Sequence, residues 1–467
     1  MFSRRLIRLL CAALFLAVTA FGDEENYWPF CVRRDDPAAG TRAVDVLGPL
    51  LFARSSPAME QRGVRPLYLS TVADGVTQGS FLYPFFSWRR EEDYHSFSFF
   101  QLVNIRTDSP ATGPRDEHFD VWPFYFSRKT ADPADSYRAL LPLGGTIKNR
   151  FAKDRIDFVL WPLYVHTEKN GRQITHAPWP FLRFIGGEGY HGFEFWPLFG
   201  RSTHDGDYEH QFALWPLLYK STSNLSEPTP DVKVGALPFY ARETGPGYIS
   251  ETYGWPFFGY THRTAPYHYD EQRYFWPFLV QAHGDDRMVN RWAPFYTHSV
   301  IKGTDKTWFL WPLYRNQRWS ADGVAQQKNQ LLFFLWWSLE QQSLTNPAAA
   351  PAHKTHVWPL YSSWDNGAGR RQVQALSPFE VFFPGNETIR QLWTPLFALY
   401  RYERNADASV RHSLLWNAVT WQRTPSTREF HLGPIGWRRR TGEPGHFFLF
   451  DFHAKAATLP ASQVPPP

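Results

Sequence analysis

Histidine and carboxylate side chains gather in two short stretches, and these are the first candidates for a chemical site. Imidazole and carboxylate groups at close spacing are ligands that zinc and other divalent cations use. Neither stretch repeats a closed ligand spacing, and the Asp-Gly-Asp of the first is too short for a calcium loop. We therefore expect no metal and no cofactor, and interpret both groups as turns and solvated strand ends. The residues are His204, Asp205, Asp207 and His210 in the first stretch and His262, His268 and Asp270 in the second.

The motifs of nucleophilic and metal-dependent enzymes are absent from the sequence. It contains no G-x-S-x-G elbow, no H-E-x-x-H, no phosphate-binding glycine loop and no Cys–His nucleophile arrangement. Carboxylates are scattered among the turns instead of standing in the apolar runs. A glycosidase-like pair is the one catalytic alternative left, because such acids need only spatial proximity. We expect the protein not to be an enzyme.

Three tryptophans outside the commonest motif of the chain stand beside arginine and form the candidate binding site. A ring and a guanidinium held together can stack on an anionic sugar and pair with its charge. This interpretation predicts binding to lipopolysaccharide or peptidoglycan. The alternative is that each ring caps the end of a strand with the arginine stacked on it. The pairs are Trp88 with Arg89, Trp319 with Arg318, and Trp437 with Arg438.

An internal repeat defines the elements that must position these residues. A proline lies at the centre of most hydrophobic runs, usually after Trp and followed by Leu or Phe, as in FALWPLLY at 212–219. Proline-free runs such as LFFLWWSLE fill the gaps in the series. The spacing indicates about 22 units of about 19 residues each, which is typical of a repeat architecture.

Turn-forming pairs such as Asn-Gly and Asp-Gly separate the units and supply the positive φ angles of tight hairpins. With 38 Pro and 18% aromatic residues, the pattern predicts an all-β antiparallel fold with almost no helix. Because proline removes a ladder donor, we expect each strand to bend at Trp-Pro, with Trp and the following Leu or Phe filling a core inside the bend. The predicted architecture is a closed barrel or rolled sheet, and the alternative is a soluble β-hairpin solenoid.

The N-terminal residues predict export. Arg4, Arg5 and Arg8 precede an apolar run, so residues 1–22 are expected to be a secretory signal peptide. The exported chain would keep Cys31 alone, so no internal disulfide is expected.

Residues 26–453 are predicted to form a single β-repeat domain, followed by a disordered Pro-rich tail over 454–467. No apolar helical run reaches the roughly 20 residues that cross a bilayer.

Composition limits the classes of partner. The 49 basic and 44 acidic residues are interspersed and give a net charge of +5, and export disfavours a nucleic-acid partner. We predict a non-catalytic exported cell-envelope protein, with a structural or scaffold role or as an outer-membrane-associated barrel. It would lie in the outer membrane or periplasm, or be secreted. The alternative is a glycan-binding module that uses the Trp/Arg pairs. Envelope glycans or lipids are the expected partners, with membrane association and oligomeric state left open.

Overall fold

A computed structural model describes residues 24–36, 40–111 and 113–450. The predicted signal peptide and the predicted C-terminal tail lie outside these residues. The described part is 60% strand and 2% helix, which confirms the all-β prediction. It divides into two compact units. Unit 1 holds the described residues up to Tyr83 and those from Gly369 onward, and unit 2 runs from Pro84 to Ala368. The single domain over 26–453 stays a prediction.

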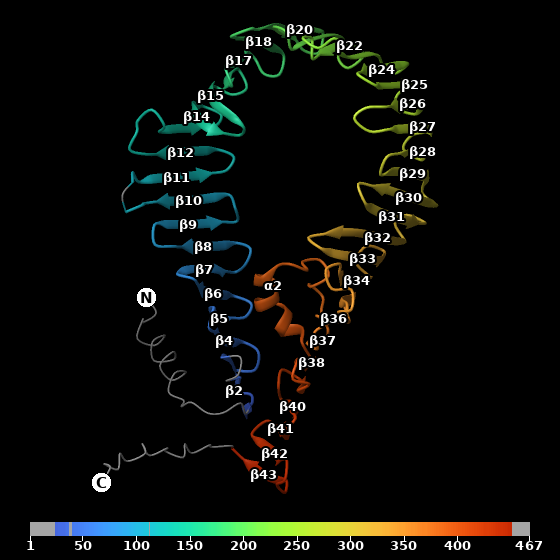
Figure 1. Ribbon diagram of the computed structural model, residues 1–467. Coiled ribbons are helices and arrows are strands. Elements are labelled where there is room, and N and C mark those ends of the chain that lie inside the picture. The colour runs from blue at the N-terminus through green and yellow to red at the C-terminus, as the bar shows by residue number, and fades with distance from the viewer. Residues whose placement is uncertain (1–23, 37–39, 112, 451–467) are drawn as a thin grey trace, which may run out of the picture. The chain divides into compact units, whose positions relative to one another are not determined.

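Unit 2 consists of strands that follow one another in chain order (Figure 1). They are β8 (Phe86–Arg90), β9 (Tyr94–Phe99), β10 (Val103–Asp108), β11 (Asp116–Val121), β12 (Tyr125–Lys129), β13 (Tyr137–Leu140), β14 (Gly144–Arg150), β15 (Lys153–Val159), β16 (Tyr164–Lys169), β17 (Arg172–His176), β18 (Leu182–Gly187), β19 (Tyr190–Phe195), β20 (Phe199–His204), β21 (Tyr208–Ala213), β22 (Leu218–Ser223), β23 (Asp231–Ala236), β24 (Tyr240–Gly245), β25 (Tyr248–Tyr253), β26 (Phe258–Arg263), β27 (Tyr269–Phe275), β28 (Leu279–Gly284), β29 (Arg287–Trp292), β30 (Tyr296–Ile301), β31 (Thr304–Phe309), β32 (Tyr314–Ala321), β33 (Val324–Leu331), β34 (Trp336–Ser343), β35 (Ala352–Val357) and β36 (Tyr361–Asp365).

Unit 1 contains the first and the last strands and two short helical segments (Figure 1). They are β1 (Glu24–Tyr27), β2 (Cys31–Asp36), β3 (Thr41–Val46), β4 (Leu51–Ser56), β5 (Met59–Val64), β6 (Tyr68–Ala73), β7 (Val76–Phe81), β37 (Arg371–Ala375), α2 (Glu387–Leu392), η1 (Thr394–Phe397), β38 (Tyr400–Arg404), β39 (Val410–Leu414), β40 (Val419–Arg423), β41 (Thr427–Leu432), β42 (Ile435–Arg440) and β43 (His446–Leu449).

The strands of the described residues belong to one antiparallel sheet that does not close. Within unit 1, β1 pairs with β2 and β43 pairs with β42, and among the described residues no pairing joins β1 to β43. The predicted closed barrel is therefore wrong, because a barrel needs its terminal strands to share a ladder.

The Trp-Pro motif forms a tight turn and is not a bend within a strand. Ala213 and Leu218 are paired in register, so the chain reverses direction over the intervening Leu-Trp-Pro-Leu, and the peptide bond before Pro216 is cis. The backbone N–H of Leu217 donates to the carbonyl of Leu214 at 2.7 Å and closes the turn. The predicted kinked strand is thus wrong, and each repeat supplies two short strands instead of one long one.

Successive Trp-Pro turns are also bonded to each other. The N–H of Trp215 donates to the carbonyl of Pro197 at 2.7 Å, and the N–H of Leu214 donates to that of Leu198 at 2.6 Å. The same bond from Trp to the proline of the preceding turn recurs at Trp161, Trp179, Trp255 and Trp311. Proline has no N–H, so in such a turn every backbone donor is satisfied. Proline at this position costs the sheet no ladder bond.

The repeat is interrupted in unit 1, where two marker prolines, Pro378 and Pro395, lie outside hairpin turns. Pro395 belongs to η1, and α2 begins after Asn386, whose side chain accepts a bond from the N–H of Ile389 at 3.0 Å. Asn before an acidic first turn is a helix N-cap signal that the proline spacing concealed. The predicted strand units around Pro378 and Pro395 are therefore wrong.

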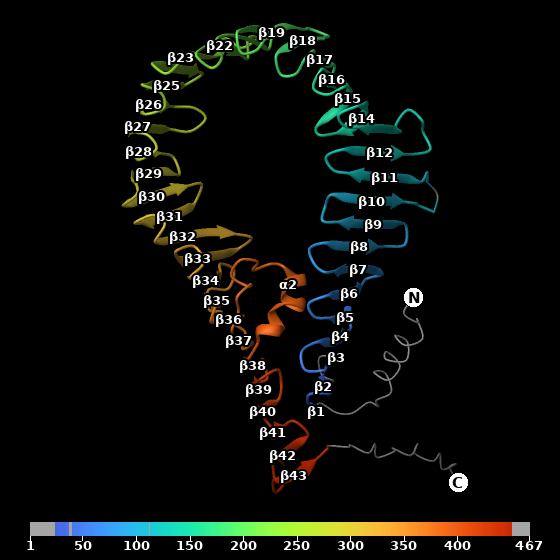
Figure 2. The ribbon, with the colours of Figure 1, turned by 180° about the vertical axis from the view of Figure 1, so that it is seen from behind.

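The α2 helix packs into the core of unit 1 (Figures 1 and 2). Leu392 is fully buried and clusters with Phe52 and Leu69 of the N-terminal strands. The Arg65 guanidinium donates from Nε to the carbonyl of Gln391 at 2.8 Å. These contacts attach α2 to β4–β6.

Two ion pairs, one buried and one half-buried, join the N-terminal and C-terminal strands of unit 1. Glu24 is 3% exposed and accepts bonds from Arg411 at 2.6 and 3.0 Å and from the Thr420 hydroxyl at 3.1 Å. A second pair joins Arg34 and Glu403 at 3.2 Å. Burial by itself would raise the pKa of Glu24, but the positive charges and hydrogen bonds of Arg411, with Arg34 nearby, lower it to about 2.

We expect Glu24→Gln to loosen unit 1, because it removes the nearer counter-charge of the buried Arg411 guanidinium and leaves only Glu403, at 3.9 Å. Breaking a buried ion pair on one side costs about 3–5 kcal/mol. Hydrogen exchange of the full chain should therefore quicken in β1 and β39. Asp108→Asn is the matched control, since its partner Arg106 is 52% exposed, and it should leave exchange unchanged. Equal effects of the two variants would contradict this role of Glu24.

Acid should destabilise unit 1 over a defined range of pH. The pKa of Asp45, with Arg54 and Arg65 beside it, is also lowered to about 2, although burial opposes the shift. Because folding lowers both pKa values from the ordinary 4.5 and 3.8, the stabilisation is complete above these values and disappears as the pH falls toward 2. The protection factors of the β1–β4 amides, which correct the exchange rates for their intrinsic pH dependence, should fall between pH 5 and about 2. A fall confined to higher pH would contradict this prediction.

Candidate functional site

The most distinctive surface of unit 2 is the edge formed by its Trp-Pro turns, here called the Trp-Pro edge. From Trp122 to Leu360 these turns contain no charged residue. Most of their large side chains are exposed, Phe239 by 77% and Trp215 by 48%. The prediction that Trp and the following Leu or Phe fill a core is therefore wrong. Other exposed turn residues are Trp122, Phe124, Leu143, Leu160, Trp161, Leu163, Trp179, Phe181, Trp196, Leu198, Leu214, Leu217, Trp255, Phe257, Trp276, Phe278, Phe295, Leu310, Trp311, Leu313 and Leu360.

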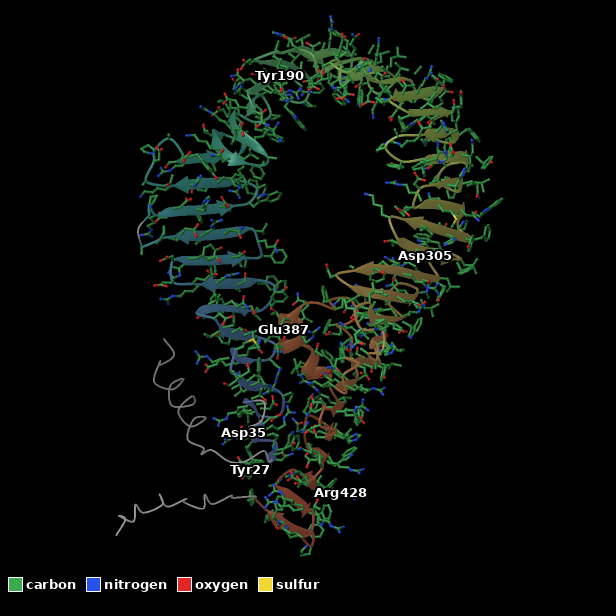
Figure 3. The ribbon with its side chains drawn as sticks, viewed as in Figure 1. Tyr27, Asp35, Tyr190, Asp305, Glu387 and Arg428 are labelled. Atoms are coloured by element: carbon green, nitrogen blue, oxygen red, sulfur yellow. The ribbon has the colours of Figure 1, made fainter. Side chains whose placement is uncertain are left out.

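The opposite edge of unit 2 has the contrary chemistry. Its turns hold Asn170 and Gly171, Asp205 to Asp207, Asp285 and Asp286, and Lys302 and Gly303. Charged and turn-forming residues suit an edge that faces water. Figure 3 shows side chains projecting from both sides of the strands of unit 2. Unit 2 is thus a band with one apolar edge and one polar edge.

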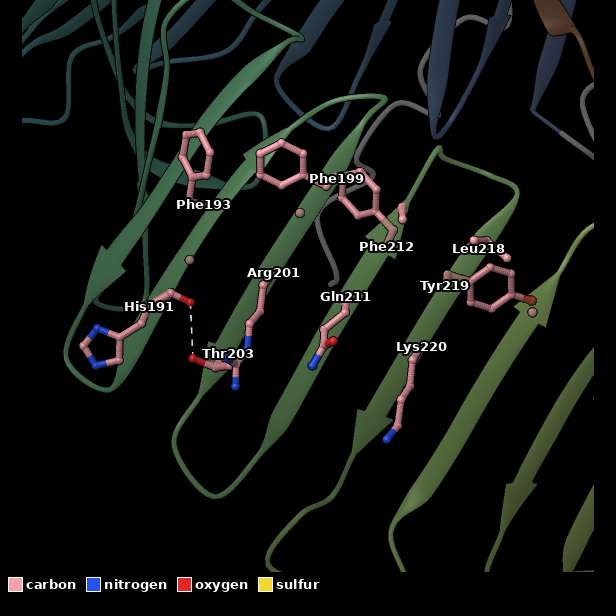
Figure 4. Close-up of a pocket in the computed structure, with 14 residues that line it drawn as sticks. His191, Phe193, Phe199, Arg201, Thr203, Gln211, Phe212, Leu218, Tyr219 and Lys220 are labelled. Carbon is pink, nitrogen blue, oxygen red and sulfur yellow. Dashed lines mark hydrogen bonds between the residues drawn. The ribbon is translucent and has the colours of Figure 1, made fainter.

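Along one face the side chains change from apolar to polar with distance from the Trp-Pro edge. Next to the turns, Phe199, Ala213 and Leu218 stand in register on one face. Two residues further along the strands, the same face carries Arg201, Gln211 and Lys220, also in register. Alternate residues of a strand share a face, so this is one continuous surface. These residues line a groove on β19 to β23. Figure 4 shows the aromatic rings at one end of this groove and the basic and amide groups at the other.

Two aromatic rings in this region lie flat over glycines of the neighbouring strand. Gly200 pairs with Phe212, and Gly235 pairs with Tyr219. A Cβ atom added at Gly235 would lie 2.2 Å from Tyr219 Cε1, and one added at Gly200 would lie 2.4 Å from Phe212 Cε1. Each ring occupies the space that a neighbouring side chain would need. Glycine at these strand positions therefore determines the ring orientation, a packing known as aromatic rescue.

The first His/Asp group forms turn and cross-strand contacts. His204 Nδ1 lies 3.1 Å from Asp207 Oδ2, and its ring stacks on Tyr190 at 3.9 Å. His210 Nδ1 lies 2.5 Å from the Ser221 hydroxyl, and burial lowers the pKa of His210. Asp205 belongs to the turn between β20 and β21. These partners agree with the interpretation as turn and strand-end chemistry.

The second group is gathered around one carboxylate. Asp270 contacts His262, and its Oδ2 lies 3.1 Å from His268 Nε2 and 3.6 Å from His283 Nε2. The hydrogen bond from His262 lowers the pKa of Asp270. Sequence reasoning missed His283, whose pairing with Asp270 follows only from strand register. In the residues that the structure describes, no group of three or more His, Cys, Asp or Glu side chains is arranged to hold a metal ion.

The three predicted Trp/Arg pairs lie on separate strands. Trp88 and Arg89 are on β8, Arg318 and Trp319 on β32, and Trp437 and Arg438 on β42. Consecutive residues of a strand point to opposite faces, so the ring and the guanidinium of each pair are directed apart.

The arginines have other partners in the structure. Arg438 is 2% exposed and donates to Glu429 at 2.6 Å, and Arg89 pairs with Glu91. Arg318 stands opposite Asp305 in register. Glycan binding at these six residues stays a prediction.

We expect Gly235→Ala to displace the Tyr219 ring and weaken the β22–β23 ladder, because the added Cβ requires space that the ring occupies. Overpacking of this kind costs about 1–3 kcal/mol. Hydrogen exchange should show a matching loss of local opening free energy in β22 and β23. Gly186→Ala is the control, since a Cβ there meets no atom within 4 Å. An unchanged β22–β23 in Gly235→Ala would show that the ring does not depend on the glycine.

Comparison of the chain with protein-family models and with curated proteins finds no match. Within residues 24–36, 40–111 and 113–450, no helix is both long and apolar enough to cross a membrane. The function is therefore inferred from the surfaces described above, and first from the Trp-Pro edge.

Proposed function

We propose that the protein is a non-catalytic, exported structural protein of the cell envelope, and that unit 2 rests on a lipid bilayer by inserting its Trp-Pro edge. The observation that carries the proposal is the edge itself, which is apolar, exposed and free of charge from Trp122 to Leu360. An exposed apolar surface of this extent marks an interaction with a partner or a membrane.

The backbone of the edge suits a medium without water. In hydrocarbon, an unsatisfied N–H costs several kcal/mol. In the turn from Leu214 to Leu217 each N–H has an acceptor, and Pro216 has none to satisfy. The same holds for the turns at Trp196, Trp255 and Trp311. The repeated proline removes a donor at the position where water would otherwise be required.

The depth of the apolar zone fits shallow insertion. On the face that carries Phe199, the turns and the adjacent row are apolar, and Arg201 and Lys220 follow two residues later. At about 3.4 Å per strand residue, the apolar zone extends for about 10 Å. Interfacial segments bury their apolar side about 5–10 Å deep, with Trp and Tyr at the headgroup level and basic side chains reaching water.

The strands are too short to cross the bilayer. β19 to β26 each contain six residues, whereas a membrane-crossing strand needs about 9–11. The proposal is therefore an edge-on contact with one leaflet, made by the repeats of unit 2 and not by a spanning barrel.

A lipid partner explains the uniformity of the edge better than a protein partner does. The turns from Trp122 to Leu360 contain only Trp, Leu, Phe, Ala, Gly and Pro, so the indole N–H is their single kind of polar side-chain group. Specific protein interfaces place polar groups among the apolar anchors to fix orientation. Acyl chains require only an apolar surface, and they adapt to any length of it.

We expect the full chain to bind phosphatidylcholine vesicles and its tryptophan fluorescence to be quenched by brominated acyl chains. Bromine near the headgroup should quench more than bromine near the chain end, because the insertion is shallow. The triple variant Trp215→Glu, Leu217→Glu and Trp311→Glu should bind at least about tenfold more weakly, since each carboxylate costs energy at the interface. Bound protein should resist carbonate extraction.

The matched control adds the same three charges away from the edge, as His191→Glu, Ser320→Glu and Gln341→Glu, all at exposed strand positions. This variant should bind vesicles as the unmodified chain does. The proposal fails if the two triple variants bind equally, or if the unmodified chain shows no quenching by any brominated lipid.

A further inference from the structure

A row of hydrogen-bonding side chains that contains no Lys, Arg, Asp or Glu runs across eight consecutive strands of unit 2. Each member stands in register with the next, so the row crosses β28 to β35 at right angles to the strands. We call it the polar row. Its members are Gln281, Asn290, His298, Thr307, Asn316, Asn329, Ser338 and Thr355.

A second row lies beside it on the same face, two residues closer to the Trp-Pro edge. Five of its eight members are aromatic, and we call it the aromatic row. Tyr296 and Phe309 are paired in register with ring centroids 5.2 Å apart, and Trp292 is 53% exposed. The members of the row are Leu279, Trp292, Tyr296, Phe309, Tyr314, Leu331, Trp336 and Val357.

Hydrogen bonds hold the two rows in a fixed arrangement. Asn290 Oδ1 accepts from Gln281 Nε2 and from Trp292 Nε1, both at 2.8 Å. Asn329 Oδ1 accepts from Asn316 Nδ2 at 2.6 Å and from the Tyr314 hydroxyl at 2.9 Å. The polar tips of the aromatic row are thus tied to the amides of the polar row. Side chains that are already positioned lose less entropy when a ligand binds.

We propose that the polar and aromatic rows together bind an extended, uncharged glycan chain that lies across the strands. Aromatic faces accept the apolar face of a sugar ring, as they do other flat apolar surfaces. Asn, Gln and Thr side chains both donate and accept hydrogen bonds, which matches sugar hydroxyls. Neighbouring strands are about 4.8 Å apart, so side chains of the rows recur at about the advance of one sugar unit along an extended chain.

The charge of the rows excludes other linear ligands. A nucleic acid or an acidic polysaccharide needs a row of Lys and Arg, and the polar row contains neither. An acyl chain would be opposed by eight hydrogen-bonding groups. A peptide strand adds to the free edge of a sheet, whereas these rows lie on its face.

The aromatic row is the row next to the turns, at the headgroup end of the zone proposed to enter lipid, and the polar row lies two residues beyond it. The sugar can therefore belong to a free polysaccharide or to the headgroup of a glycolipid in the same membrane. The inference does not depend on bilayer insertion, because soluble sugar binding can be measured without lipid.

Binding of the full chain to cellohexaose and maltohexaose, measured by calorimetry, tests the site. At least one hexasaccharide should bind saturably. Asn316→Ala with Asn329→Ala should weaken this binding by about tenfold, as expected for the loss of two or more hydrogen bonds. The control is Gln317→Ala with Gln326→Ala, which removes two amides from the opposite face of the same strands and should leave affinity unchanged.

Vesicles with and without digalactosyl diacylglycerol distinguish the two sources of sugar. Stronger binding to the glycolipid vesicles that requires Asn316 and Asn329 identifies a headgroup, whether or not the hexasaccharides bind. The triple variant Trp215→Glu, Leu217→Glu and Trp311→Glu, which should bind vesicles weakly, should keep its affinity for a hexasaccharide. The membrane proposal and the glycan proposal can therefore fail independently. The inference would be overturned if no sugar probe bound, or if Gln317→Ala with Gln326→Ala weakened sugar binding as much as Asn316→Ala with Asn329→Ala. It would also be overturned if the chain bound the acidic polysaccharide polygalacturonate more tightly than the uncharged probes.

Discussion

Backbone donors at the turning points of a sheet need acceptors, and unit 2 meets this requirement by bonding each Trp-Pro turn to the one before it. The N–H of Trp215 reaches the carbonyl of Pro197, and the N–H of Leu217 closes its own turn. Proline removes the one remaining donor. Because the turns satisfy themselves, they need no water and no polar side chains. The apolar edge follows from this arrangement.

The same hydrogen bonds fix the spacing of the hairpins and so determine what the faces present. Once the turns are in register, residues at equal distance from the edge form rows across the strands. Phe199, Ala213 and Leu218 make an apolar row, and Arg201, Gln211 and Lys220 make a polar one. Further along the chain, the polar row from Gln281 to Thr355 arises in the same way. A repeat of single side chains thereby becomes an extended surface.

Unit 1 is stabilised differently from unit 2. Its N-terminal and C-terminal strands meet around the buried Glu24–Arg411 pair and the half-buried Arg34–Glu403 pair, and α2 contributes the buried Leu392. Paired buried charges are costly to separate, so they specify which strands meet. Unit 2 has its clearest buried apolar cluster on β12 to β15, around Phe126 and Phe158. Elsewhere it depends on the ladder between neighbours, as repeat proteins do.

Local patterns were sufficient to predict part of the fold. Asn-Gly and Asp-Gly turns, aromatic runs and frequent proline predicted antiparallel strands and little helix, because turn chemistry and strand preference act within a few residues. The helix at α2 carried its own local signal, Asn386 followed by Glu387. The regular proline spacing concealed that signal.

The sequence by itself determined the strand chemistry, the repeat and the types of residue at each turn. Tertiary structure alone decided that Trp-Pro reverses the chain, because an apolar run around proline fits a bend and a turn equally well. It also decided that Trp215 is exposed, that His283 joins Asp270, and that Glu24 meets Arg411. The candidate glycan site was hidden for the same reason. Its members are separated along the chain, and only the register of eight strands places them in one row.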